Sequence, residues 1–206
     1  MNEAQELKAR IKLTSQELFM QYGIRSISMD DLATAIGISK KTIYQYYADK
    51  DSLVLEIVET ILAENKKNCE GTKVMAENAI HEDFLAIGIT MELFRNMNPT
   101  LISDLYKYHP RAYKKFSDYR DNYLYGILKE NIERGIAEGC FREDIQVELM
   151  ARFRVESIMA PFLPGYYGKV NGSLADIQLE LFYLFLYGMS TPRGYKMITK
   201  YKQQQK

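Results

Sequence analysis

The sequence is poor in the residues that build disulfide frameworks and metal sites, and it carries no excess of either charge. Its 206 residues include two cysteines, Cys69 and Cys140, which are too few for a disulfide framework and lack CxxC spacing. Only two histidines are present, His81 and His109, so no zinc ligand set is apparent. Lys plus Arg and Asp plus Glu each number 27, so no global field attracts nucleic acid or a membrane. Any DNA binding must depend on a local patch.

Long hydrophobic runs and enzyme motifs are also absent. The longest dense apolar run, Leu179–Met189, falls well short of the roughly 20 residues that span a bilayer. The N-terminal stretch MNEAQELKARIK is charged and lacks the apolar centre of a secretory signal. A nucleophile elbow, a phosphate loop and a motif with paired carboxylates are all missing. We therefore expect a cytoplasmic protein that is not an enzyme, needs no cofactor or metal, and has no membrane partner.

Apolar residues recur at helical spacing along nearly the whole chain, and no useful stretch has strand periodicity. The sequence predicts an all-α fold with about nine helices. Pro192 and Gly194 follow the last helix, and the polar tail KYKQQQK is expected to be frayed. Gly71 is expected to end the fourth helix, and Pro161 and Pro164 to interrupt or bend the eighth. The predicted helices span about Glu3–Tyr22, Ser28–Ile36, Ser39–Tyr47, Asp49–Asn68, Met75–Met97, Thr100–Tyr108, Arg111–Glu138, Ile145–Tyr166 and Leu174–Met189.

The stretch from Ser28 to Lys50 predicts a helix-turn-helix. Ser28 is a good N-cap, and Asp31 stands three residues later, where a carboxylate completes a capping box. Gly37 suits the left-handed position that ends a helix, and Ser39 then starts a second short helix. A short helix, a turn containing glycine and a second short helix form the motif. We expect a helix-turn-helix domain over residues 1–48 and a larger helical domain over 49–206.

The run Leu179–Met189 is apolar on nearly every side, so its helix must be buried on several sides. A terminal helix would normally be half exposed, and burial against a second copy of the chain accounts for the composition. A two-fold dimer through the last two predicted helices is the economical interpretation. The alternative is that this helix fills the centre of its own domain.

The N-terminal segment resembles the TetR family of transcriptional regulators. The resemblance rests on Leu18-Phe19 and Tyr22-Gly23, then SMDDLA at 28–33 with IGIS at 36–39, KKTIYQYY at 40–47 and DKDSL at 49–53. A looser match, GIAEGCFREDI at 135–145, is similar to the turn between the seventh and eighth helices of that family.

This resemblance implies a ligand-responsive DNA-binding regulator. The expected form is a dimeric repressor that a small, largely apolar effector releases from a palindromic operator on double-stranded DNA. The larger domain would hold the effector pocket, and its last two helices would form the homodimer interface. The alternative is a helical sensor or carrier for small molecules that does not bind specific DNA.

The helical wheel of the second short helix selects the residues expected to contact DNA. With Ile43 toward the core, Lys41 and Gln45 lie on the opposite face and are placed to reach base edges. Lys41 stands where the family commonly has glycine. Tyr47 matches a phenylalanine of the family motif and is expected in the core. The other expected contacts are the flanking and capping residues Ser28, Ser39, Lys40, Thr42, Tyr44 and Tyr46, and Lys50, which matches the family's phosphate-binding lysine.

The effector pocket is less well defined by the sequence. The chain has 16 tyrosines, nine phenylalanines and ten methionines, and part of this set is expected to line an apolar cavity. Each single residue is more often plain core. The candidates are Met91, Phe94, Met97, Tyr106, Phe116, Tyr119, Tyr123 and Phe162.

Overall fold

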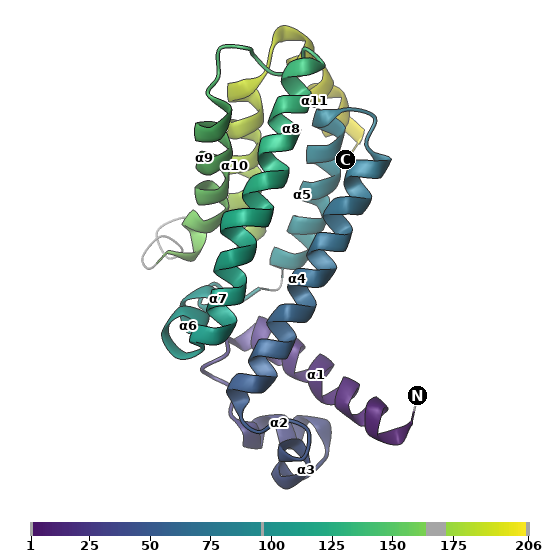
Figure 1. Cartoon of the computed structure of the whole chain (residues 1–206), viewed down its shortest axis with the longest axis vertical. Coiled ribbons are helices and arrows are strands. Elements are labelled where there is room, and N and C mark those ends of the chain that lie inside the picture. The colour runs from purple at the N-terminus through teal and green to yellow at the C-terminus, as the bar shows by residue number, and fades with distance from the viewer. Residues whose placement is uncertain (1, 96, 164–171, 205–206) are drawn as a thin grey trace. The chain divides into compact units, whose positions relative to one another are not determined.

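The computed structural model describes residues 2–95, 97–163 and 172–204, and Figure 1 shows the chain as a ribbon. Within these ranges nearly every residue is helical, and extended pairing is limited to one isolated bridge between Phe141 and Ser190. The all-α prediction is confirmed. None of the helices formed by the described residues is long and apolar enough to cross a membrane.

The chain divides into two compact units. Unit 1 consists of the described residues up to Ala63 and those at 97–117, and unit 2 of Glu64–Arg95 and the described residues from Asp118 onward. This division concerns packing, and the domain boundary between residues 48 and 49 stays a prediction. The helix α4 (Lys50–Met75) contributes residues to both units.

Unit 1 contains the N-terminal helices and a helical pair from the middle of the chain. Its other helices are α1 (Glu3–Tyr22), α2 (Met29–Ile36), α3 (Lys40–Tyr44), α6 (Leu101–Tyr108) and nearly all of α7 (Pro110–Asp118). One core joins them, in which Ile11, Leu32, Ile43 and Leu53 are fully buried. Burial of a side chain of this size contributes about 1.5–3 kcal/mol.

Unit 2 is a bundle in which α5, α8, α9 and α10 run alongside one another (Figure 1). Its core includes Ile80, Phe84, Ile132, Phe182 and Leu186. The helical segments are α5 (Ala79–Arg95), the π-helix η1 (Tyr119–Leu124), α8 (Tyr125–Ala137), α9 (Val147–Met159), the 3-10 turn η2 (Ala160–Phe162), α10 (Leu174–Met189) and α11 (Pro192–Gln204).

Two predicted helix boundaries before residue 100 are wrong. Gly71 does not end α4, which continues to Met75, because a glycine inside a helix costs only about 1 kcal/mol relative to alanine. The next helix begins at Ala79 and not at Met75. Asn78 acts as its cap, since Asn78 Oδ1 accepts a hydrogen bond from His81 N at 2.9 Å.

Three predictions in the second half of the chain also need correction. The predicted helix over 111–138 contains a π-helical segment, η1, between α7 and α8. The predicted helix over 145–166 ends at Met159, with Pro161 in the turn η2, and Pro164 and Tyr166 lie outside the described residues.

The tail KYKQQQK was expected to be frayed, but its described residues, up to Gln204, belong to α11, the helix missing from the predicted set. Proline at the first helical position and Thr191, whose Oγ1 accepts from Gly194 N at 3.1 Å, start this helix. With α7, η1 and α8 counted as one helix, and η2 as the end of α9, the described residues form ten helices.

Candidate functional site

The helices α2 and α3 are held by the caps that the sequence predicts. Ser28 and Asp31 form a capping box, with Asp31 N donating to Ser28 Oγ and Ser28 N donating to Asp31 Oδ2. Gly37 ends α2 with φ of +75°, a left-handed conformation that glycine adopts at least cost. Thr42 N donates to Ser39 Oγ at 3.0 Å at the start of α3. The predicted helix-turn-helix is therefore confirmed as a structure.

The two faces of α3 separate core residues from exposed polar ones. Ile43 and Tyr47 are buried, as expected. Lys41 and Gln45 are exposed, and within the described residues their side chains make no hydrogen bond or ion pair. Tyr44 is also exposed, whereas Thr42 and Tyr46 are half-buried. Lys41 and Gln45 thus leave their donor and acceptor groups available on one face.

Five of the other seven predicted DNA-contact residues already have partners within unit 1, among them Lys50 and Thr42, whose Oγ1 lies 2.8 Å from Ser39 Oγ. Lys40 Nζ forms an exposed ion pair with Asp30 at 2.8 Å. Ser28 and Ser39 are engaged as caps, so a phosphate contact there would share the side chain with a cap.

Lys50 has a structural position that the sequence did not indicate. Its ammonium donates hydrogen bonds to the carbonyls of Ile24 and Ile27 and lies 5.4 Å from the centroid of the Phe19 ring. Burial lowers the pKa of Lys50, partly offset by the charges of Asp104 and Asp31. An ammonium has three N–H groups. Two are used inside the protein, and the phosphate contact of Lys50 stays a prediction.

Residues of α6 and the segment before it hold the loop that leads into α2. Asp104 Oδ2 accepts from Arg25 N at 3.0 Å, and Asn98 N donates to Met20 O at 2.6 Å. At the start of α4, Asp51 Oδ1 lies 2.7 Å from Nδ1 of His109. His109 is buried, although a histidine before proline is more often a surface loop residue. These are contacts between distant segments, and no local sequence pattern marks them.

The eight residues predicted to line a pocket are divided between the two units. Met97, Tyr106 and Phe116 belong to unit 1, where Tyr106 is 65% exposed. In unit 2, Phe94 and Phe162 pack edge to face with centroids 5.3 Å apart, and Met91 packs against the core. Tyr119 and Tyr123 lie on η1 with ring centroids 5.2 Å apart. Of the eight, Tyr123 lines the cavity described next.

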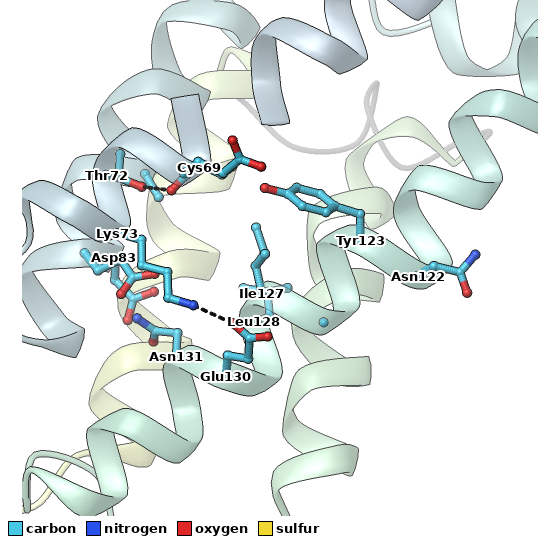
Figure 2. Close-up of a pocket in the computed structure, with 14 residues that line it drawn as sticks. Cys69, Thr72, Lys73, Asp83, Asn122, Tyr123, Ile127, Leu128, Glu130 and Asn131 are labelled. Atoms are coloured by element: carbon cyan, nitrogen blue, oxygen red, sulfur yellow. Dashed lines mark hydrogen bonds and ion pairs between the residues drawn. The ribbon is translucent and has the colours of Figure 1, made fainter. Parts of the chain in front are cut away.

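A cavity of about 310 Å³ lies within unit 2, between residues of α4, α5, η1 and α8 (Figure 2). Its wall carries more acidic groups than basic ones. Lys73 forms an ion pair with Glu130 at 2.6 Å, which Figure 2 shows as a dashed line. Glu82 is paired at 3.1 Å with Arg134, which lies outside the lining set. The remaining acids of the lining are Glu70 and Asp83.

Asp83 stands out among these acids. Its Oδ2 atom is buried, and it has no hydrogen-bond partner among the described residues. Burial raises the pKa of Asp83 to about 8, against the opposing effect of the Arg154 charge. The protonated form of this carboxyl group is therefore favoured near neutral pH. Asp83 is neither aromatic nor a methionine, so the pattern used to predict the pocket did not include it.

Comparisons with known proteins agree with the helix-turn-helix. Residues 14–57 match the model of the family described as "Bacterial regulatory proteins, tetR family". An uncharacterized HTH-type transcriptional regulator of Bacillus subtilis (strain 168), YvaF, is 35% identical over 108 residues, which are 50% of this chain and 55% of that protein. The HTH-type transcriptional repressor KstR2 of Rhodococcus jostii (strain RHA1) is 27% identical over 154 residues, 66% of this chain and 68% of the repressor. The chain thus spans about half to two thirds of these relatives.

A solved structure supports the fold over nearly the whole chain. A TetR-family transcriptional regulator from Agrobacterium tumefaciens superposes with a TM-score of 0.77 at 17% identity, covering 92% of this chain and all of that one. At that identity the likeness concerns the fold alone. The family model over residues 14–57, the relatives and the fold agree with the capped helices α2 and α3, and all of them indicate the TetR family of transcriptional regulators.

Proposed function

We propose that this chain is a DNA-binding transcriptional regulator that reads a palindromic operator with α3. The observation that carries the proposal is the face of α3 opposite Ile43. There the polar ends of Lys41 and Gln45 are exposed and free of partners within the described residues. A lysine donates to guanine O6 and N7, and a glutamine pairs with the N6 and N7 edge of adenine.

The caps of α2 and α3 support this reading in a second way. Ser28 and Ser39 fix the helix starts, so the face of α3 is presented by a framework whose local hydrogen bonds are already made. Phosphate contacts by Lys40, Thr42, Tyr44 and Tyr46 would set the register on DNA without reading its sequence.

We propose a homodimer through α9 and α10, the last two helices of the predicted set. Most of the apolar side chains of α10 pack inside their own unit, including Phe182, Phe185 and Leu186. Three large apolar side chains of α9 and α10 remain exposed: Leu149 at 55%, Phe153 at 51% and Leu184 at 67%. A second copy covering this surface would present two α3 helices to half-sites about one helical turn apart.

Regulation by a small-molecule effector is part of the proposal. The cavity of unit 2 is the candidate effector site, and α4 contributes both to unit 1 and to the wall of this cavity. An effector that binds one conformation of α4 more tightly would shift the affinity for operator by the same coupling free energy. Release of the operator would make the chain a repressor.

The test is a titration of a palindromic DNA from the upstream region of the gene itself. We expect tight binding, with log K falling steeply against log salt at a slope of about −0.9 for each phosphate neutralised. Binding of the same strength to scrambled DNA would contradict the proposal. It would favour the alternative, a small-molecule sensor or carrier whose helix-turn-helix does not read DNA.

A further inference from the structure

Two residues in the wall of the cavity carry an acceptor atom without a partner, and the one on Asp83 is buried. Oδ2 of Asp83, on α5, accepts no hydrogen bond from the described residues. Asn131, on α8, is 6% exposed and donates from Nδ2 to Ala79 O at 3.0 Å, and no hydrogen bond of its Oδ1 is found in the described parts of the chain. Both residues line the cavity (Figure 2). Both unused atoms are acceptors when Asp83 is ionised, so a ligand that satisfies them must donate hydrogen bonds.

The charges around Asp83 favour a donor that is also a cation. Four carboxyl groups line the cavity. Glu130 is paired with Lys73 and Glu82 with Arg134, and Glu70 is exposed to solvent. Asp83 forms no ion pair with any described residue.

Arg154 on α9 is the charge that most offsets the effect of burial on Asp83, but it is not paired with it. Its guanidinium is buried beside the rings of Phe182 and Phe185, and its Nη1 donates to Ser157 Oγ at 3.3 Å. Arg134 is shared, because its Nε also donates to Glu138 at 2.7 Å. With every group ionised, the four carboxylates of the lining therefore outnumber the cations beside them, and a positive charge on a ligand would reduce this excess.

Part of the wall is apolar. Ala86, Ile127, Leu128 and the ring of Tyr123 contribute carbon surface to the same cavity. A ligand with a short hydrocarbon body would remove that part from water here, which favours binding. The cavity can therefore accommodate a largely apolar effector, as predicted, that also carries an ionic group.

We propose that this cavity binds a small organic cation, an alkyl- or arylammonium compound. Its N–H groups donate to Asp83 Oδ2 and Asn131 Oδ1, and its hydrocarbon part lies against Ile127 and Leu128. The inference deepens the proposed function, because this cation is then the effector. A carboxylate ligand has no hydrogen to donate to these two acceptor atoms, and ionised Asp83 would repel its charge. A neutral alcohol has a single O–H to donate and no charge to pair with Asp83.

The test uses three probes of equal length: hexylammonium, hexan-1-ol and hexanoate. Isothermal titration calorimetry on the full chain near neutral pH should give an affinity for hexylammonium at least about tenfold above that for the other two. Asp83→Asn keeps the shape of the side chain and should lower the affinity for hexylammonium by about tenfold or more. Glu133→Gln removes the same formal charge from an exposed position of α8 outside the cavity lining and should change it by less than about threefold. Equal affinity for the three probes, or equal losses in both variants, would overturn the inference.

The pH dependence of the unmodified protein gives a second test that needs no variant. Burial raises the pKa of Asp83, so below about pH 8 a proton must leave before the cation binds. The affinity for hexylammonium should then rise by about tenfold for each pH unit up to about 8 and level off above it. The charged and titratable groups that face Asp83 are Glu82 on its own helix, Cys69, Glu70 and Lys73 on α4, Tyr123 on η1, Glu130 and Arg134 on α8, and Arg154 on α9.

Several of these groups keep their protonation over that range. Burial raises the pKa of the Cys69 thiol and that of the Tyr123 phenol, so both stay neutral. Burial lowers the pKa of Arg154 to about 10, so it stays a cation. An affinity independent of pH between about 6 and 8 would contradict the role of Asp83.

The effect on DNA separates this inference from the proposed function. If hexylammonium binds with the pattern above and lowers the operator affinity of the unmodified chain but not of Asp83→Asn, both stand. If it binds with that pattern and leaves operator binding unchanged, the cation site stands and the effector role fails. If operator binding is specific but the probes do not discriminate, the cation site fails and the DNA-binding proposal stands.

Discussion

The helix-turn-helix of unit 1 and the cavity of unit 2 differ in where their free polar groups lie. In unit 1, Ser28, Ser39 and Lys50 satisfy backbone groups close to them, and Lys41 and Gln45 keep polar ends exposed on α3, although the buried hydroxyl of Tyr47 has no partner among the described residues. In unit 2, Asp83 keeps a buried acceptor atom without a partner in the wall of a cavity. An exposed polar group costs little to leave free, whereas a buried one costs about 1–3 kcal/mol. The exposed polar groups of unit 1 suit a surface that binds DNA, and the buried acceptor of unit 2 suits a site that binds a ligand.

The largest effect is expected at the exposed apolar surface of α9 and α10, through which two copies of the chain would associate. Phe153→Glu combined with Leu184→Glu places charges in the proposed interface and should convert the dimer to a monomer. Because the two half-sites then bind independently, operator affinity should fall by about a hundredfold or more. Sedimentation velocity and DNA titration measure the two effects.

Val74→Glu combined with Met75→Glu is the matched control for that experiment. It changes two exposed apolar side chains at the end of α4, away from the proposed interface. A dimer in both double variants would place the interface elsewhere.

The next largest effect is expected at Lys50, where a substitution tests whether the ammonium is needed for hydrogen bonds inside unit 1. Lys50→Met keeps most of the aliphatic stem but removes the ammonium from the carbonyls of Ile24 and Ile27. We expect a loss of about 2 kcal/mol in the free energy of unfolding, measured by urea denaturation, because two carbonyls lose a charged donor. Lys41→Met is the control and should leave stability unchanged.

The same variant separates the structural role of Lys50 from the predicted phosphate contact. A phosphate contact would reduce the salt slope of DNA binding by about 1 when the ammonium is removed. An unchanged stability together with a reduced slope would reverse our interpretation of Lys50.

The smallest effect concerns the stability of unit 2. The pKa of Asp83 is raised to about 8 in the folded chain, so between its unfolded value and about 8 the folded state binds the extra proton. The stability contributed by that proton is lost as the pH rises toward about 8. Asp83→Asn removes this dependence, and its melting temperature relative to the unmodified chain should rise by about a few degrees between pH 5 and pH 8. A difference that stays constant with pH would show that Asp83 is ionised in the empty cavity.

The same contrast explains what the sequence could predict. The caps, the glycine turn and the buried positions of α2 and α3 depend on residues three or four apart, so a local pattern was enough to predict them. Lys50 could not be interpreted in this way, because its carbonyl partners lie 23 and 26 residues earlier in the chain. The loop contact of Asp104 with Arg25 spans 79 residues.

The cavity left a signal in the sequence that a search for aromatic residues overlooks. Asp83 follows Ile80 by three positions and precedes Ile87 by four, so it lies on the apolar stripe of α5. Asn131 follows Ile127 by four positions and Leu128 by three, so it also lies on an apolar stripe. A polar residue on an apolar stripe indicates a buried polar site. Which of these residues face one cavity depends on how the helices pack, which periodicity does not determine.

The central claim, that α3 reads DNA through Lys41 and Gln45, is tested most directly by one titration. Fluorescence anisotropy with the palindromic DNA compares the unmodified chain, Lys41→Ala/Gln45→Ala, and the control Lys196→Ala/Gln203→Ala, which changes the same residue types at exposed positions of α11. Each base contact is worth about 1–3 kcal/mol, so the first variant should lose about a hundredfold in operator affinity while its stability and its binding to scrambled DNA change little. The control should bind like the unmodified chain. Equal affinities for all three proteins would contradict the assignment of α3 as the DNA-reading helix.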